Sequence, residues 1–124
     1  MGYRSDVVLA IDAALVPQFM ATLAKSPEAR SFCFSHSDEV VKDYCEPGCL
    51  LFRWDDVKWY DSFEEVAAIV DFLGWAEAER VDWNGTKADG DNFFRFVRIG
   101  ESYDDIDVIG YGFDHIQPTR SIDY

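Results

Sequence analysis

Three cysteines and a histidine in the first half of the chain are the residues best suited to hold a metal ion. Cys33 and His36 are three positions apart, and Cys45 and Cys49 stand on either side of Glu-Pro-Gly. Three thiolates and one imidazole are a sound tetrahedral zinc set. However, Cys33 lies between two phenylalanines, as a small core residue would, and the second pair has three intervening residues instead of two. We therefore favour core and surface thiols, and we expect neither a metal ion nor another cofactor.

An acidic stretch at 101–107 is the second candidate for chemistry. Hydrolases use two carboxylates with separated pKa values, or carboxylates that hold a divalent metal ion. In a strand, Asp105 and Asp107 would project to one face while the apolar residues beside them face the other, which is typical of a solvated sheet edge. Ordinary surface acids are therefore preferred. A small metal-dependent hydrolase that uses the Glu101–Asp107 turn is kept as the alternative function.

No other enzyme motif stands out in the sequence. His36 and His115 are the two histidines, and neither accompanies a recognisable nucleophile motif. Gly110 and Gly112 are explained by a bulge or close packing at the end of a strand, without a phosphate-binding loop. We expect a protein that is not an enzyme and has no catalytic residues.

The net charge of −13 is unevenly distributed along the chain. Residues 1–37 hold as many bases as acids, so the whole excess of negative charge lies in residues 38–124. Such a chain repels DNA, RNA and anionic membranes, and it is attracted to basic partners. The excess also serves solubility, which requires no partner.

The start of the chain gives no sign of export. Its apolar run, Val7–Ile11, is too short for the hydrophobic part of a signal peptide or for a membrane span. We expect a cytoplasmic protein, in which the three cysteines stay reduced.

The spacing of apolar residues predicts a single α+β domain over residues 1–124. Strands are expected at 3–11, 39–45, 49–60, 93–99 and 106–113, with a short helix at 38–44 as the alternative to the second strand. The third of these strands is the longest, and Asp55-Asp56 is expected to kink it. Polar loops are expected at 84–90 and in the tail after Pro118.

Two helices are expected between these strands. The first begins near Pro17, with a further short helical turn after Ser26-Pro27, and the second follows a capping box formed by Ser62 and Glu65. The resulting fold is a mostly antiparallel sheet of four or five strands with two helices packed on one face. A ferredoxin-like arrangement is one version of it.

Residues 54–66 combine large aromatic rings with acids. Some of the acids fall at the start of the expected helix, where the helix dipole favours anions. Asp55 and Asp56 have no such explanation, and they are close in sequence to tryptophan and tyrosine, which are frequent at energetically important positions of interfaces. Together with the acidic turn, this stretch predicts a partner-binding surface. Its residues are Asp55, Asp56, Trp59, Tyr60, Glu64, Glu65, Glu101, Asp104, Asp105 and Asp107.

Four blocks of the sequence carry a family resemblance. They are the opening Met-Gly-Tyr-Arg-Ser-Asp-Val, the stretch Val57–Asp61, the turn from Arg98 to Ile106, and the closing Arg120-Ser-Ile122. Together they resemble a group of small acidic proteins encoded by bacteriophages. The group has no established activity, so the resemblance implies no catalytic residues.

The resemblance implies a setting and a kind of function. Small phage accessory proteins often bind and disable host machinery, including CRISPR surveillance complexes and nucleases. The implied function is that of a non-catalytic, anti-CRISPR-like inhibitor in the host cytoplasm, which binds a basic surface of a host nucleic-acid-handling or defence protein. Its carboxylates would then mimic the charge of a nucleic acid. We expect no direct binding to nucleic acid or membrane, and a monomer or homodimer.

Overall fold

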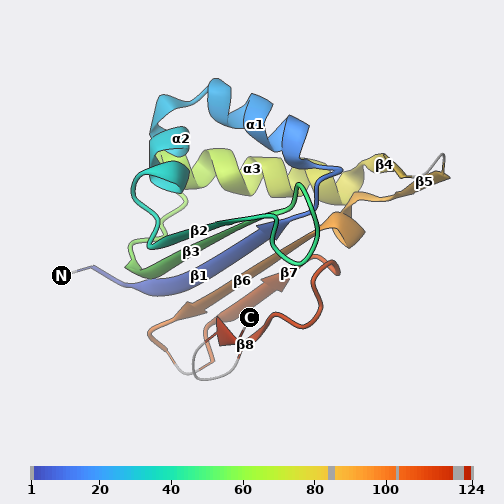
Figure 1. Cartoon of the computed structure of the whole chain (residues 1–124). Coiled ribbons are helices and arrows are strands. Elements are labelled where there is room, and N and C mark those ends of the chain that lie inside the picture. Colours follow the sequence, from blue (N-terminus) through green and yellow to red (C-terminus); the bar gives the residue numbers. More distant parts are fainter. Residues whose placement is uncertain (1, 84–85, 103, 119–121, 124) are drawn as a thin grey trace.

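The computed structural model describes residues 2–83, 86–102, 104–118 and 122–123 (Figure 1). Its main sheet is antiparallel and has the strand order β2-β3-β1-β6-β7. The strands are β1 (Ser5–Ile11), β2 (Glu39–Lys42), β3 (Leu50–Val57), β6 (Phe94–Gly100) and β7 (Ile106–Ile109). The helices α1 (Val16–Ala24), α2 (Pro27–Phe34) and α3 (Glu64–Ala78) lie on one face of this sheet. The expected α+β class and the five-stranded sheet are confirmed.

The order of the strands is that of a split β-α-β fold. Helices α1 and α2 connect β1 to β2, and α3 connects β3 to β6. In each connection the chain passes over the neighbouring strand, so that β3 lies between β2 and β1, and β1 lies between β3 and β6. This is the ferredoxin-like arrangement, to which β7 adds a strand at one edge.

The expected number of two helices is wrong, because the first connection contains two separate helices. Ser26 interrupts the helical path, and its hydroxyl oxygen accepts a hydrogen bond of 3.3 Å from the N–H of Ala29. Pro27 follows at the first helical position, where its missing N–H costs no hydrogen bond. The cap and the proline together start a new helix instead of a single extra turn.

The expected capping box before α3 is also wrong. The helix begins at Glu64, and its cap position is Phe63, which has an extended backbone and no side chain able to accept a hydrogen bond. Ser62 is therefore one position too early to cap the helix. Glu64 and Glu65 still lie in the first turn, where the helix dipole favours their charge.

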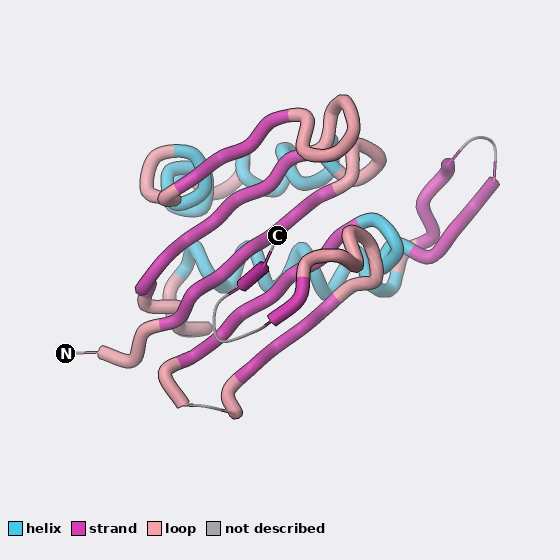
Figure 2. Tube along the Cα trace, turned by 60° about the horizontal axis from the view of Figure 1, so that its bottom comes forward, coloured by secondary structure: helices cyan, strands magenta, loops and turns pink. Residues whose placement is uncertain are grey.

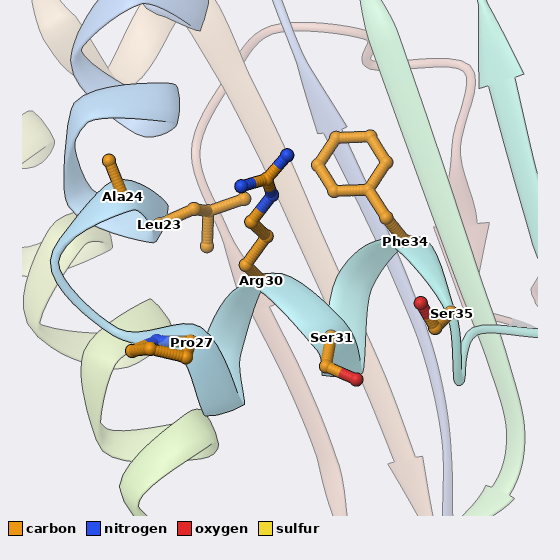
Figure 3. A pocket seen from close by; sticks show the side chains of 7 residues that line it. All are labelled: Leu23, Ala24, Pro27, Arg30, Ser31, Phe34 and Ser35. Carbon is orange, nitrogen blue, oxygen red and sulfur yellow. The ribbon is translucent and has the colours of Figure 1, made fainter.

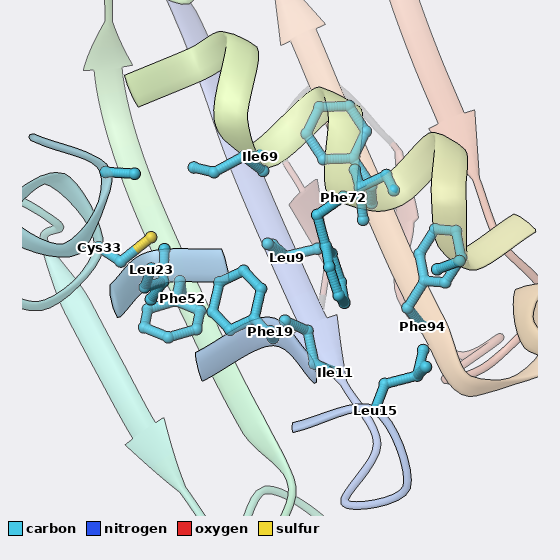
Figure 4. Close-up of a cluster of buried hydrophobic side chains, with 14 of the residues drawn as sticks. Leu9, Ile11, Leu15, Phe19, Leu23, Cys33, Phe52, Ile69, Phe72 and Phe94 are labelled. Carbon is cyan, nitrogen blue, oxygen red and sulfur yellow. The ribbon is translucent and has the colours of Figure 1, made fainter. Parts of the chain in front are cut away.

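The larger part of the core lies between the sheet and the helices (Figure 4). Leu9 and Ile11 of β1 pack there with Phe19 of α1 and Phe72 of α3. The rings of Phe19 and Phe72 are 5.1 Å apart in an edge-to-face arrangement, which adds to the stabilisation from burying their apolar area. A smaller cluster covers the opposite face of β1. Its buried residues are Val8, Ala10, Leu51, Val97 and Ile116.

The two arginines of β6, Arg95 and Arg98, have different environments. They are three positions apart and therefore point to opposite faces of the sheet. Arg95 is only 8% exposed, and its guanidinium donates hydrogen bonds to the carbonyl oxygens of Ile116 (3.1 Å) and Gly110 (2.9 Å). Arg95 thus ties the segment after β7 to the second face of the sheet.

Two small hairpins complete the fold. The strands β4 (Arg80–Trp83) and β5 (Thr86–Asp89) extend away from the main sheet (Figure 2) and lead into the short 3-10 helix η1 (Gly90–Phe93). The polar loop expected at 84–90 is therefore largely β5, while residues 84 and 85 lie outside the described residues. Strands β8 (Gln117–Pro118) and β9 (Ile122–Asp123) pair near the end of the chain, where residues 119–121 and 124 are likewise outside the described residues. None of the helices in the described ranges is both long and apolar enough to cross a membrane.

Gly110 is a position at which an alanine should destabilise the fold. Its φ angle is +90°, and an added Cβ would collide with the carbonyl oxygen of Phe94. We expect Gly110→Ala to lower the free energy of unfolding by about 2 kcal/mol. Urea denaturation followed by tryptophan fluorescence measures this change.

Gly74→Ala is the matched control. Gly74 lies in α3, and an added Cβ there would have no atom within 4 Å. Alanine should therefore raise the free energy of unfolding by about 0.5–1 kcal/mol, because it reduces the freedom of the unfolded chain. Equal effects of the two substitutions would contradict the assigned backbone conformation.

Candidate functional site

The N-terminal segment ties two loops together at one end of the sheet. The N–H of Tyr3 donates a hydrogen bond to the hydroxyl oxygen of Tyr60 (2.6 Å), and the Tyr3 hydroxyl donates to Oδ2 of Asp105 (2.6 Å). The N–H of Arg4 donates to Oε2 of Glu101 at 3.0 Å. The loop that follows β3 and the turn between β6 and β7 therefore lie beside each other, with residues 3 and 4 between them. The two halves of the predicted binding surface meet here.

A groove of about 620 Å³ opens at this end, between α3 and the strands β6 and β7. Leu73 and Gly74 of α3 form part of one wall, and Phe96 and Ile109 of the strands form part of the other. Four carboxylates and one guanidinium also line it. They belong to Asp61, Glu77, Asp105, Asp107 and Arg98. Hereafter we call this the α3–β7 groove.

The aromatic wall of the α3–β7 groove continues the core. The half-buried ring of Trp59 lies 5.7 Å from that of Trp54 and 5.5 Å from that of Phe96. Trp54 itself is 1% exposed, and its indole N–H donates a 3.0 Å hydrogen bond to the carbonyl oxygen of Phe32. Trp54 is thus a core residue, whereas Trp59 and Tyr60 line the groove from half-buried positions.

Arg98 pairs with both Asp105 and Asp107, the inner acids of the groove. Its Nη2 lies 2.6 Å from Oδ1 of Asp105 and 2.8 Å from Oδ2 of Asp107, and its Nη1 donates a 3.0 Å hydrogen bond to the hydroxyl of Ser5. The hydrogen bond from Arg98, followed by that from Tyr3, lowers the pKa of Asp105 below its ordinary value of 3.8. Asp105 is therefore ionised at neutral pH, and Asp105 and Asp107 share Arg98 as one cationic partner.

A second hollow, of about 400 Å³, is lined by three more of the predicted acids. Asp55, Asp56 and Glu65 line it together with the cations Arg4 and Lys58. The strand kinks here as expected, because the pairing of β3 with β1 shifts register and Asp56 adopts a φ angle of +54°. The kink turns two successive acids away from the core, and both are exposed.

The remaining predicted residues, Glu64, Glu101 and Asp104, are exposed and line neither hollow. Three of the predicted acids form ion pairs with arginines. Asp55 pairs with Arg53, and Asp105 and Asp107 pair with Arg98. Within the described ranges, no ion pair involves Asp56, Glu64, Glu65 or Asp104. The set of free carboxylates at this end is therefore smaller than the sequence suggested.

Sequence reasoning missed Tyr3, Asp61, Glu77 and Arg98 as parts of this site. One signal was available for Arg98, because it lies directly opposite Asp107 in the hairpin of β6 and β7. Opposite charges that face each other across two strands attract, so the register of this hairpin predicts the pair. Tyr3 and Glu77 come from distant parts of the chain, and no local pattern indicates their approach.

The four residues of the weighed zinc set lie apart. Cys33 lies on the buried side of α2, and burial raises the pKa of its thiol to about 12. His36 lines the second hollow. Cys45 and Cys49 lie at the opposite end of β3, where Sγ of Cys45 is 3.9 Å from Nε2 of His115. In the described part of the chain, these residues form no common metal site.

A further hollow, of about 390 Å³, lies where α1 turns into α2 (Figure 3). Arg30 and Phe34 are one helical turn apart and project from the same side of α2 into it. Its lining contains Arg30, two serines and apolar residues, but no carboxylate, cysteine or histidine. It offers no residue set for acid–base or metal chemistry.

The lowered pKa of Asp105 predicts a pH-dependent contribution to stability. The unfolded chain takes up the proton first, so the contribution is complete above pH 3.8 and is lost as the pH falls through the lower pKa of the folded state. We expect Asp105→Asn to lower the free energy of unfolding by about 1 kcal/mol at pH 7. Urea denaturation at pH 7 and below pH 3 should show that the difference shrinks in acid.

Asp104→Asn is the control for this prediction, because Asp104 is exposed and has no ion pair among the described residues. It should change the free energy of unfolding by less than about 0.5 kcal/mol at either pH. A loss in Asp105→Asn that persists unchanged in acid would argue against the ion pair as its cause.

Comparisons with protein-family models, with curated proteins and with solved structures find no match to this chain. What the protein does must therefore be inferred from its own residues.

Proposed function

We propose that the protein is a non-catalytic inhibitor that binds a basic surface of a host nucleic-acid-handling or defence protein. It would act in the host cytoplasm in the manner of an anti-CRISPR protein, with carboxylates in place of nucleic-acid phosphates. The observation that supports this best is the α3–β7 groove, where four carboxylates and one guanidinium meet aromatic side chains at the end of the sheet. A groove of this composition favours a cationic occupant over an anionic one.

The charge that attracts the partner comes from the rim of the groove. Asp105 and Asp107 are held by Arg98, whereas Asp61 and Glu77 have no ion pair in the described part of the chain. Both are exposed, so a partner's lysine or arginine can reach them without displacing Arg98. The net charge of −13 adds long-range attraction and speeds the encounter.

The aromatic residues supply the short-range part of the proposed contact. Trp59 and Tyr60 line the groove and are held in place by the core and by the Tyr3 N–H, so they lose little freedom on binding. A guanidinium or ammonium group over such a ring is attracted to its face by about 0.5–1 kcal/mol at an exposed site. Contacts of this kind require no reactive side chain, in keeping with an inhibitor that acts by occupying the partner's binding surface.

The alternative of a metal-dependent hydrolase receives no support from the geometry. The guanidinium of Arg98 lies between the carboxylates of Asp105 and Asp107. A divalent cation bound by these two carboxylates would have to take the place of the guanidinium. Among the described residues, the acids of the turn do not form a group of three with ligand atoms close enough to share an ion. We therefore propose no catalytic role for them.

The proposal is tested by capturing the partner and then measuring the complex. Immobilised protein is exposed to host lysate at low and at high salt, and the retained protein is purified. Salt shortens the range of electrostatic attraction to about 10 Å near 0.1 M and about 3 Å at 1 M, so the dissociation constant should rise at least about tenfold between these conditions. The complex should also exclude the partner's nucleic acid, which a competition assay detects.

Two matched variants assign the effect to the groove. Removing both rim charges, in Asp61→Asn with Glu77→Gln, should weaken binding about tenfold at low salt, since each exposed charge pair contributes up to about 1 kcal/mol. Glu28→Gln with Asp71→Asn removes two exposed acids that line neither acidic hollow, and this pair should change the dissociation constant less than twofold. A complex that resists salt, or a partner that holds nucleic acid and this protein together, would refute the proposal.

A further inference from the structure

The end of the sheet opposite the α3–β7 groove brings together three residues that can ligate a metal ion. Ile11 at the end of β1 pairs with Leu50 at the start of β3, so Asp12 and Cys49 are the next residues on adjoining strands. Their side chains approach to 3.9 Å between Oδ2 of Asp12 and Sγ of Cys49. Glu46 completes the group, in which all three ligand atoms lie within 4.8 Å of one another.

These separations suit a zinc ion. Zinc bonds to sulfur at about 2.3 Å and to a carboxylate oxygen at about 2.0–2.2 Å, so a tetrahedral ion places sulfur and oxygen ligands about 3.5 Å apart. The observed 3.9 Å between Asp12 and Cys49 therefore requires only a small closure. One thiolate with two carboxylates is also a ligand set of mixed softness, which zinc accepts more readily than calcium or magnesium do.

Hydrogen bonds hold the Asp12 carboxylate and the backbone of the loop that carries Glu46 and Cys49, and they leave the ligand atoms available. Oδ1 of Asp12 accepts a 2.9 Å hydrogen bond from the N–H of Ala14, which directs Oδ2 toward the thiol. The carbonyl oxygen of Glu46 accepts from the N–H of Cys49 at 3.3 Å and folds the loop back on itself. Such outer contacts orient the ligands of metal sites. Cys49 is buried while Glu46 is exposed, so an ion can enter from the solvent side.

We propose that Asp12, Glu46 and Cys49 form a zinc-binding site, with a water molecule as the fourth ligand. The thiol proton of Cys49 leaves to solvent as the zinc–sulfur bond forms, so binding at neutral pH releases one proton for each ion. The three ligands then carry three negative charges, which the ion partly neutralises. The site is independent of the function proposed for the α3–β7 groove.

Cobalt(II) is the probe for this site, because a cobalt–thiolate bond gives an absorption band that carboxylates alone do not. Reduced, chelator-treated full-length protein is titrated with cobalt(II), and zinc is then added. We expect the band to saturate at one ion per chain and to disappear when zinc displaces cobalt. Wild-type protein without a band, or with a band that zinc leaves unchanged, would overturn the proposal.

Substituting one ligand at a time distinguishes metal binding at this site from metal binding at another thiol of the protein. Cys49→Ser should abolish the band, and Asp12→Asn, which keeps the oxygen that Ala14 requires, should weaken cobalt binding at least about tenfold. Glu46→Gln should do the same, and because Glu46 is exposed this change leaves the fold intact. Carboxylate variants that bind as tightly as wild type would overturn the site.

Cys45→Ser is the matched control. Cys45 is exposed, and its sulfur lies 3.9 Å from Nε2 of His115. The variant should keep the cobalt band with an affinity within about threefold of wild type. Loss of the band in Cys45→Ser would place the metal at the pair of Cys45 and His115 and refute the proposed ligands.

Discussion

β1 is buried on both of its faces, and this constraint determines where the other strands, the helices and the loops at both ends of the sheet lie. Val7 to Ile11 are each at most 1% exposed, because helices cover one face of the strand and the segment around Ile116 covers the other. β1 also runs antiparallel to both neighbours, so its start meets the end of β3 and the end of β6. The loops that follow those strands are thereby gathered at the start of β1, where Tyr3 and Arg4 join them. At its other end, β1 places Asp12 beside the loop that precedes β3.

Arg53 and Arg98 lie where carboxylates converge, and they offset part of the excess negative charge there. Arg98 joins the carboxylates of Asp105 and Asp107 to the hydroxyl of Ser5, and so connects β1, β6 and β7. Arg53 contacts Glu39 on β2 and Asp55 beside it on β3. Arg95 binds only carbonyl oxygens in the contacts described here. Self-repulsion of the acids, which opposes compact folding, is thus relieved locally while the net charge of the chain is kept.

The elements that could be predicted from the sequence are those whose signals are local. The apolar spacing along β1, β3 and β6 is in each case a pattern within one stretch of chain, and the sheet was expected from these patterns. The kink at Asp55-Asp56 was foreseen for the same reason. The division between α1 and α2 was underestimated, although Ser26 and Pro27 were recognised as a helix start.

The parts of the site that could not be predicted depend on contacts between distant residues. The possible zinc set considered from the sequence grouped Cys49 with Cys33 and His36. The register of the strands instead places Cys49 beside Asp12, thirty-seven positions earlier. Tyr3 reaches Asp105 across more than a hundred positions. Neither of these two contacts can be predicted from the local sequence pattern, because both follow from the order of strands in the sheet.

Arg98 also determines which acids of the groove can serve a partner. A cation that approached Asp105 or Asp107 would compete with a guanidinium that is already in place and hydrogen-bonded to both. The free energy of such an exchange is small, because one charged contact replaces another of similar strength. An approach to Asp61 and Glu77 replaces only water. The inner acids therefore hold the strands and the N-terminal segment together, and in the proposed function the exposed acids at the rim supply most of the attraction for a basic partner. The groove therefore has an inner part, in which Arg98 offsets one of two carboxylate charges, and an exposed acidic edge.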